Sequence, residues 1–152
     1  MTTGLYLEEF EVGRVNQHAI RRTVTEMYNK LFSCLTNNPQ PQHIDHEFAR
    51  QTEWGKPLVN SMFTLGLMIG ISVNDTTLGT TIGNLGMTEV KFPSPVFHGD
   101  TINVTTEVLS RRETRSRPDA GIVEFAHKAF NQRGELVAEC RRQAMMRKRP
   151  KE

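Results

Sequence analysis

The chain has 152 residues, 37% of them hydrophobic and 24% charged, with a net charge of +2. This length predicts one domain, residues 1–152, and the composition is that of a folded protein, which excludes a disordered chain. The small net charge gives no global attraction to nucleic acid, and the most apolar stretch, residues 62–73, is too short to span a bilayer. The N-terminus shows no signal-peptide pattern. We therefore expect a cytoplasmic protein without a nucleic-acid or membrane partner.

The N-terminal half predicts one early strand and two helices. Residues 10–20 mix polar and apolar side chains without helical spacing, which favours a strand. Thr23–Glu26 has the form of a capping box, and the apolar spacing after it predicts a helix over about 25–36. Asparagines and prolines at 37–41 end that helix. A second, short helix is expected from Asp45, a good N-cap residue, to about Glu53.

The next segment, residues 61–74, is apolar on nearly every side, which predicts a helix buried all round. Strands are expected after it, at 80–92, 101–109, 123–129 and 136–144. Only a sheet that curls round the helix could cover it. The prediction is an α+β chain with a single hot-dog fold, in which an antiparallel sheet wraps a long buried helix. Its open sheet edge predicts a homodimer or a higher homo-oligomer.

The loop 36–45 is the strongest candidate for chemistry, because it holds amides, an imidazole and a carboxylate between rigid prolines. His43 could act as a general acid and base near neutral pH, and Asn38 could hold a water or a substrate oxygen. The alternative for His43 is an ordinary surface histidine. Asp45 supports the loop or simply caps the next helix.

The remaining sequence favours acid–base chemistry over covalent, metal or cofactor chemistry. There is no Gly-x-Ser-x-Gly elbow, no glycine-rich phosphate loop and no convincing metal-ligand spacing. The N-terminus of the helix at 61–74 offers backbone N–H groups, at about Asn60 and Ser61, that could stabilise an oxyanion.

A cluster of arginines lies between two of the expected strands. Arginine pairs with phosphate or carboxylate through two parallel hydrogen bonds. Arg111, Arg115 and Arg117 could therefore hold the phosphates of CoA or a carboxylate of the substrate. The alternative is a solvated hairpin end.

With these motifs in this order, the chain resembles the MaoC-like enoyl-CoA hydratases over about residues 5–147. The hydration motif of that family has an Asp five positions before its His and an Asp two positions after it. Here His43-Ile44-Asp45 keeps the end of the motif, whereas Asn38 stands in place of the first Asp. The usual Asp–His pair that shares one water would thus be reduced to His43.

In lacking that Asp, the chain resembles the branch of mesaconyl-CoA and itaconyl-CoA hydratases. The segments that share this likeness are Gly55–Ser61, Phe92–Val96, Gly99–Thr101 and Arg115–Pro118. The resemblance implies a hydro-lyase that adds water to, or removes it from, the CoA ester of a branched dicarboxylic acid. It implies no cofactor beyond the CoA of the substrate.

Two other functions stay open. The same fold hosts acyl-CoA thioesterases, for which Asp45 or Glu53 could supply the base. A non-catalytic module is the other: one that binds acyl-CoA, or one that binds nucleic acid through the basic tail 147–151.

Overall fold

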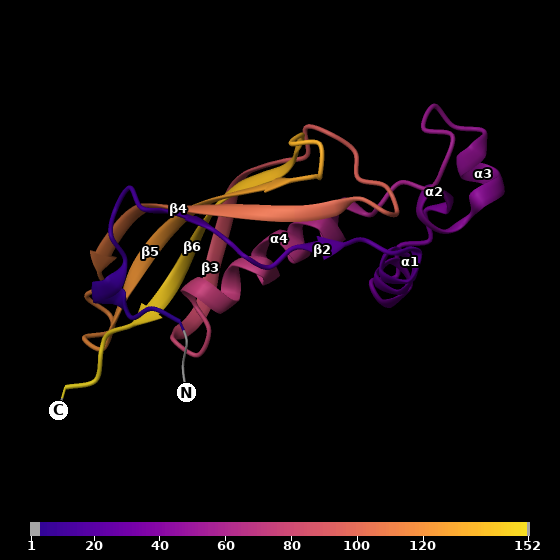
Figure 1. Ribbon diagram of the computed structural model, residues 1–152. Coiled ribbons are helices and arrows are strands. Elements are labelled where there is room, and N and C mark those ends of the chain that lie inside the picture. The colour runs from indigo at the N-terminus through magenta and orange to yellow at the C-terminus, as the bar shows by residue number, and fades with distance from the viewer. Residues whose placement is uncertain (1–3, 152) are drawn as a thin grey trace.

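The computed structural model describes residues 4–151, which form an antiparallel sheet with one long helix packed against it (Figure 1). The strand order is β1-β4-β5-β6-β3, and β2 pairs with β4. The strands are β1 (Val15–Gln17), β2 (Arg22–Thr23), β3 (Thr81–Lys91), β4 (Thr101–Glu113), β5 (Ala120–Phe130) and β6 (Leu136–Arg147). The helices are η1 (Leu7–Glu9), α1 (Glu26–Leu35), α2 (Pro41–Ile44), α3 (His46–Arg50) and α4 (Ser61–Thr76). The α+β, hot-dog prediction is confirmed. Within residues 4–151, no helix is both long and apolar enough to cross a membrane.

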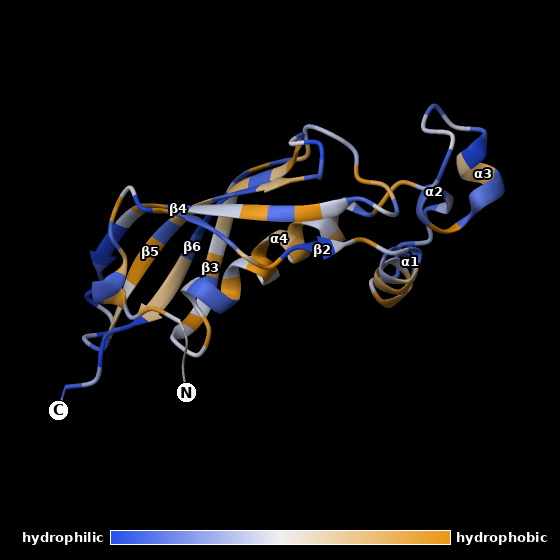
Figure 2. Ribbon diagram, in the orientation of Figure 1, coloured by the Kyte–Doolittle hydropathy of each residue, from blue (hydrophilic) through white to orange (hydrophobic). Residues whose placement is uncertain are grey.

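Helix α4 forms the centre of the fold and packs against β4, β5 and β6. Its N-cap is Asn60, whose side chain accepts a hydrogen bond from the Met62 N–H at 3.0 Å. Met68 and Ile71 are buried at 0% and 4% exposure. Hydropathy colouring shows apolar residues along this helix, which lies beside the sheet (Figure 2).

The prediction that this helix is buried all round is wrong for the single chain. Gly66 and Gly70 are exposed, and a Cβ added at either would meet no atom within 4 Å. Met62 is 49% exposed. The reason is geometric: the sheet of one chain lies against one side of α4 and leaves the glycine side open.

Local hydrogen bonds correct the predicted N-terminal elements. Thr25, and not Thr23, caps α1 by accepting a hydrogen bond from the Tyr28 N–H. Thr23 belongs to β2 and bonds the Thr101 hydroxyl at 2.8 Å. The strand expected at 10–20 is reduced to the three residues of β1, and a second short strand, β2, follows outside that range. The loop at 36–45 contains the short helix α2.

A chain of polar side chains crosses the core beneath the C-terminal half of α4. The Arg142 Nε lies 3.1 Å from the His127 Nε2, and the His127 Nδ1 lies 2.8 Å from the Thr106 hydroxyl. That hydroxyl lies 2.8 Å from the His18 Nε2, and the His18 Nδ1 lies 2.9 Å from the Asp75 carboxylate. His18, which the sequence pattern places at the surface, is only 6% exposed.

When the His18 ring is neutral, the donors and acceptors allow one arrangement of protons along this chain. Arginine can only donate, so the His127 Nε2 accepts and its Nδ1 donates to Thr106. The Thr106 hydroxyl then donates to the His18 Nε2, and the His18 Nδ1 donates to Asp75. Burial first, and then the charges of Arg142 and His18, lower the pKa of His127 from 6.5 to about 3, so this ring is neutral.

Candidate active site

His43 lies on α2 and its imidazole is half-buried. The His43 Nδ1 lies 2.7 Å from the backbone carbonyl oxygen of Leu58. A carbonyl can only accept, so the neutral ring must carry its proton on Nδ1 and present a lone pair on Nε2. Within residues 4–151, Nε2 has no hydrogen-bond partner. The fold thereby supplies a histidine whose free nitrogen can take up a proton.

The turn before α2 fixes the direction of this ring. Pro41 occupies the first turn of α2, where its missing N–H is tolerated. The Asn38 Oδ1 accepts a hydrogen bond from the Gln40 N–H at 3.1 Å, which closes the turn. The amide oxygen of Asn38 is therefore used within the loop, and its NH₂ group is the part left for a water or substrate. The role of Asn38 in positioning water stays a prediction.

The sequence leaves two roles open for Asp45, support of the loop or capping of the next helix, and the structure shows the cap. Its Oδ1 accepts hydrogen bonds from the Glu47 N–H at 2.9 Å and the Phe48 N–H at 3.1 Å, which caps α3. The carboxylate is exposed. Asp45 thus supports the segment that follows His43 without entering the polar network of the site.

Asn29 on α1 joins three segments of the site and is 0% exposed. Its Nδ2 lies 3.2 Å from the carbonyl oxygen of His43, 3.1 Å from that of Leu58 and 3.0 Å from the His98 Nε2. Its Oδ1 accepts a hydrogen bond from the Asn60 N–H at 2.8 Å. The sequence interpretation assigned no role to Asn29, because nothing in the pattern of α1 separates this buried amide from its neighbours.

The N-terminus of α4 therefore offers only one of the two expected donors. The Asn60 N–H is already bonded to Asn29, so Asn60 is not a free oxyanion donor, and this part of the prediction is corrected. The Ser61 N–H has no hydrogen-bond partner among the described residues. Ser61 is the first residue of α4, where an unpaired N–H and the helix dipole both favour negative charge. Its role as oxyanion donor stays a prediction.

A cavity of about 200 Å³ opens beside Ser61 and is lined without a charged side chain. Its walls are Trp54, Leu58, Val59, Ser61, Thr64, Phe92, Pro93, Ser94, Pro95, Val96 and Val137. Two of these residues belong to the site just described, since Leu58 holds His43 and Ser61 carries the free N–H. The cavity is therefore suited to an apolar acyl group next to the base.

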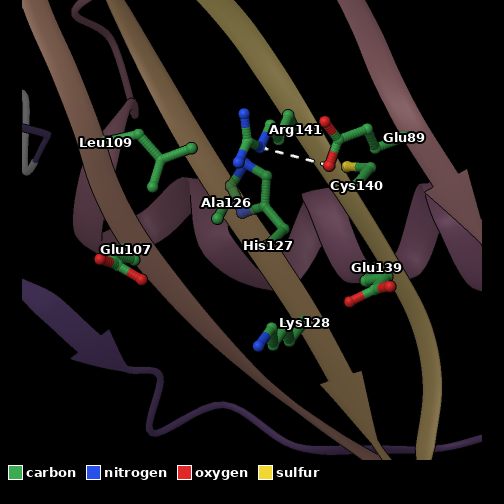
Figure 3. A pocket seen from close by; sticks show the side chains of 9 residues that line it. All are labelled: Glu89, Glu107, Leu109, Ala126, His127, Lys128, Glu139, Cys140 and Arg141. Carbon is green, nitrogen blue, oxygen red and sulfur yellow. Dashed lines mark ion pairs between the residues drawn. The ribbon is translucent and has the colours of Figure 1, made fainter.

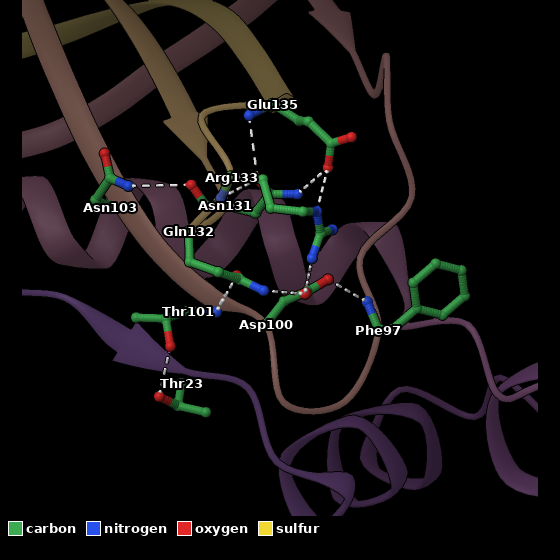
Figure 4. A network of polar contacts seen from close by, with 9 residues as sticks. All are labelled: Thr23, Phe97, Asp100, Thr101, Asn103, Asn131, Gln132, Arg133 and Glu135. Carbon is green, nitrogen blue, oxygen red and sulfur yellow. Dashed lines mark hydrogen bonds and ion pairs between the residues drawn. The ribbon is translucent and has the colours of Figure 1, made fainter.

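The segment that precedes β4 forms one wall of this cavity and is fixed by Asp100, which is 5% exposed (Figure 4). The Asp100 Oδ2 accepts from the Phe97 N–H at 2.9 Å, and its Oδ1 accepts from Gln132 at 2.8 Å and Arg133 at 3.3 Å. Burial alone would raise the pKa of this carboxyl, but these hydrogen bonds and the Arg133 charge outweigh burial and lower it. The Gly-Asp-Thr motif at 99–101 thus has a structural explanation.

Charged groups lie outside the cavity, around α1 and α3. Glu26 accepts hydrogen bonds from Lys30 at 2.5 Å and His46 at 2.8 Å, which lower its pKa to about 2. The His46 ring lies 6.4 Å from that of His98, centroid to centroid. Burial lowers the pKa of His98. A neutral His98 can accept the hydrogen bond from Asn29 at Nε2.

The structure does not bring the predicted arginines to His43. The β4–β5 connection lies near the chain termini, whereas α1, α2 and α3 lie beyond the other end of the sheet (Figure 1). Strand β4 has 13 residues between these ends, or about 40 Å at roughly 3.3 Å per residue. Arg111 donates to the carbonyls of Glu8 at 2.7 Å and Phe10 at 3.2 Å. Arg117 pairs with Asp119 at 2.7 Å, and Arg115 is exposed. Their contact with CoA stays a prediction.

Another hollow, of about 250 Å³, lies across the strands and carries both signs of charge (Figure 3). Its lining residues are Glu89, Glu107, Leu109, Ala126, His127, Lys128, Glu139, Cys140 and Arg141. Arg141 is already paired with Glu89 at 3.4 Å. His127 is buried and its nitrogens are both used in the polar chain. Among its lining residues the hollow has no histidine with a free nitrogen and no helix N-terminus, so it is the weaker candidate.

Comparison with known proteins identifies the family of this chain. The sequence description of the MaoC like domain matches residues 9–128. The chain belongs to this family. Its match covers the segment from before β1 into β5, and so includes α2, the N-terminus of α4 and the wall at 92–98.

Two curated relatives have names that describe a reaction. A mesaconyl-CoA hydratase of Cereibacter sphaeroides is 31% identical over 96% of this chain, and a beta-methylmalyl-CoA dehydratase of Chloroflexus aurantiacus is 30% identical over 96%. This MaoC-like chain spans only 42% and 41% of their lengths. A solved Archaeoglobus structure, described as a monoamine oxidase regulatory protein, has a TM-score of 0.85 and 32% identity, and the alignment covers 99% of this chain and 100% of that one.

Proposed function

We propose that the protein is a hydro-lyase that interconverts an enoyl-CoA and a 3-hydroxyacyl-CoA. The observation that carries this proposal is the hydrogen bond between the His43 Nδ1 and the Leu58 carbonyl. It leaves the His43 Nε2 as a base and anchors it to a residue three positions before the free Ser61 N–H. Base and oxyanion donor are thereby held by one short segment of chain.

In the proposed reaction, the thioester carbonyl oxygen binds at the Ser61 N–H, where the helix dipole stabilises the enolate. The His43 Nε2 takes a proton from a water held by the Asn38 amide, and the water oxygen adds to the β-carbon. The proton on His43 is then delivered to the α-carbon, so that one water has been added across the double bond. Dehydration is the reverse. No metal or organic cofactor takes part in these steps.

We propose a branched dicarboxylic acyl-CoA of the mesaconyl-CoA or itaconyl-CoA type as the substrate. The two relatives with names of this kind support the choice. Because no charged side chain lines the cavity, the free carboxylate would lie at its rim. Lys56 is a candidate partner there, since its Nζ lies 4.3 Å above the ring of Phe97, which contacts Trp54 of the cavity wall. Arg115 is the candidate for the CoA phosphates.

The test incubates purified protein with mesaconyl-CoA, itaconyl-CoA and crotonyl-CoA and follows the acyl-CoA mass. Addition of one water, absent in the His43→Ala variant, is the expected result. No change with any of the three would refute the proposal. Release of free CoA thiol in place of hydration would favour the thioesterase, and binding without turnover would favour the non-catalytic module.

We further propose that the protein works as a homodimer in the cytoplasm. Strand β3 is 11 residues long and lies at the end of the strand order, with Leu85 at 48% and Val90 at 37% exposure. A long edge strand with apolar side chains favours pairing with another strand. Light scattering of the native protein and of Leu85→Lys tests this: a dimer that the substitution weakens is expected, and a monomer in both would contradict it.

A further inference from the structure

We propose that Asn29 is a positioning residue that holds the base His43 and the oxyanion donor Ser61 in register. This inference rests on the proposed function, in which both groups act on one substrate. Asn29 touches neither the acyl group nor the reacting atoms. It acts through the backbone on both sides of the site.

The side chain of Asn29 connects segments far apart in sequence. The His43 carbonyl and the Leu58 carbonyl both lie within 3.2 Å of its Nδ2, and the Asn60 N–H lies 2.8 Å from its Oδ1. The Leu58 carbonyl also accepts the proton of the His43 ring at 2.7 Å. One amide therefore fixes the carbonyl that sets the tautomer of His43 and the peptide that precedes Ser61.

The amide group is needed in this orientation. Its oxygen must face the Asn60 N–H, because an NH₂ group there would place donor against donor. Its two N–H protons then serve three acceptors, the carbonyls of His43 and Leu58 and the His98 Nε2. A carboxylate has no proton to give to these acceptors, and alanine has neither donor nor acceptor. Both leave buried polar groups unpaired.

The location of Asn29 also explains why it can act over two segments. It is held by its own helix, since its backbone N–H donates to the carbonyl of Thr25, the N-cap of α1, at 3.3 Å. One turn further along α1, the Ser33 hydroxyl accepts from the side chain of Asn60 at 3.3 Å. Helix α1 thus presents two buried polar groups to the start of α4, and only Asn29 also reaches the segment of His43.

The experiment compares Asn29→Ala and Asn29→Asp with Asn103→Ala, a control that removes another half-buried amide, one bonded to the Phe130 carbonyl at 3.2 Å. Steady-state hydration gives kcat and KM, and ¹⁵N NMR of the histidine rings gives the tautomer of His43. NMR needs no substrate, so it reads the positioning even if the proposed reaction is wrong. Asn29→Asp keeps the size of the side chain and the acceptor for the Asn60 N–H, and circular dichroism establishes that each variant is folded before it is compared.

We expect kcat to fall at least tenfold in both Asn29 variants with KM changed less than threefold, while Asn103→Ala stays within twofold of the native protein. We also expect the native His43 signal to be that of a single Nδ1–H tautomer and the Asn29 variants to show a mixture. An unchanged tautomer in both folded Asn29 variants would overturn the proposal, whatever the activity. A changed tautomer in a protein without hydratase activity would refute the proposed function and leave the positioning intact.

Discussion

Removal of His127 should make the stability of the protein less sensitive to acid. In the folded chain the ring is 0% exposed and has a pKa of about 3, lowered from 6.5 by burial first and then by Arg142 and His18. In the unfolded chain it titrates with its ordinary pKa. Between these two values the unfolded state binds a proton that the folded state does not, so the folded state loses stability as the pH falls.

The size of this effect follows from the two pKa values. Each pH unit below 6.5 lowers the folding equilibrium constant about tenfold, and between pH 7 and pH 5 His127 alone should remove roughly 2 kcal/mol of stability. The variant His127→Gln keeps hydrogen-bonding groups and lacks this titration. It should be less stable than the native protein at pH 7, and the difference should narrow by roughly 2 kcal/mol at pH 5.

The assay is urea unfolding at pH 7 and pH 5, followed by circular dichroism at one fixed protein concentration. His46→Gln is the matched control, because it removes a surface histidine that contacts Glu26 and leaves His127 in place. Its pH dependence should stay close to that of the native protein. If His127→Gln and the native protein lose the same stability between the two pH values, the assignment of His127 as a buried neutral ring is wrong.

The other predictions concern the site and the arginines. His43→Ala should lower kcat/KM for hydration at least about 100-fold while the thermal midpoint changes little, and a near-normal rate would remove His43 from the mechanism. Ser61→Pro deletes the free N–H at a helix position that accepts proline, after a residue, Asn60, whose ψ of 123° suits a following proline. It should lower kcat about 10²–10³-fold, whereas Ser61→Ala, which keeps the N–H, should not, and equal rates for the two would exclude this donor. Arg111→Ala should destabilise the fold by about 1 kcal/mol in denaturant unfolding, because it frees the carbonyls near η1, with KM unchanged. Arg115→Ala should raise KM for acyl-CoA without lowering stability. An unchanged KM would show that Arg115 is an ordinary solvated residue of the hairpin.

The sequence predicts the elements well where periodicity is long. The strands of the C-terminal half and the helix predicted at 61–74 show clear alternation or continuous apolar character, and the structure confirms their order. The prediction fails for the open side of α4. Apolar character reveals that a helix is covered, but it does not reveal which side is covered by the same chain, and here Gly66 and Gly70 are left exposed.

The candidate site is predictable to the same limited extent. His43 stands out because a loop of prolines and amides surrounds it. Asn29 and His98 do not, because their contacts depend on three segments that meet only in the folded chain. The claim of Asn60 to the oxyanion role fails for the same reason, since the group that occupies its N–H lies 31 residues earlier. The arginines lie far from His43 because β4 runs between them. The number of residues between two motifs does not reveal that they lie at opposite ends of a strand.

The polar chain beneath α4 shows how a carboxylate, an imidazole and a hydroxyl can share the connectivity of a hydrolase triad without being one. Asp75, His18 and Thr106 lie at 2.9 Å and 2.8 Å from one another in the order that activates a nucleophile. Thr106 is 0% exposed, and its hydroxyl accepts a hydrogen bond from the His127 Nδ1 and donates one to the His18 Nε2. Because this hydroxyl is fully buried, no substrate can approach it. The three side chains have a structural role: they connect the segment after β1, the end of α4 and the sheet. Interatomic distances alone would suggest a second active site here, whereas burial excludes one.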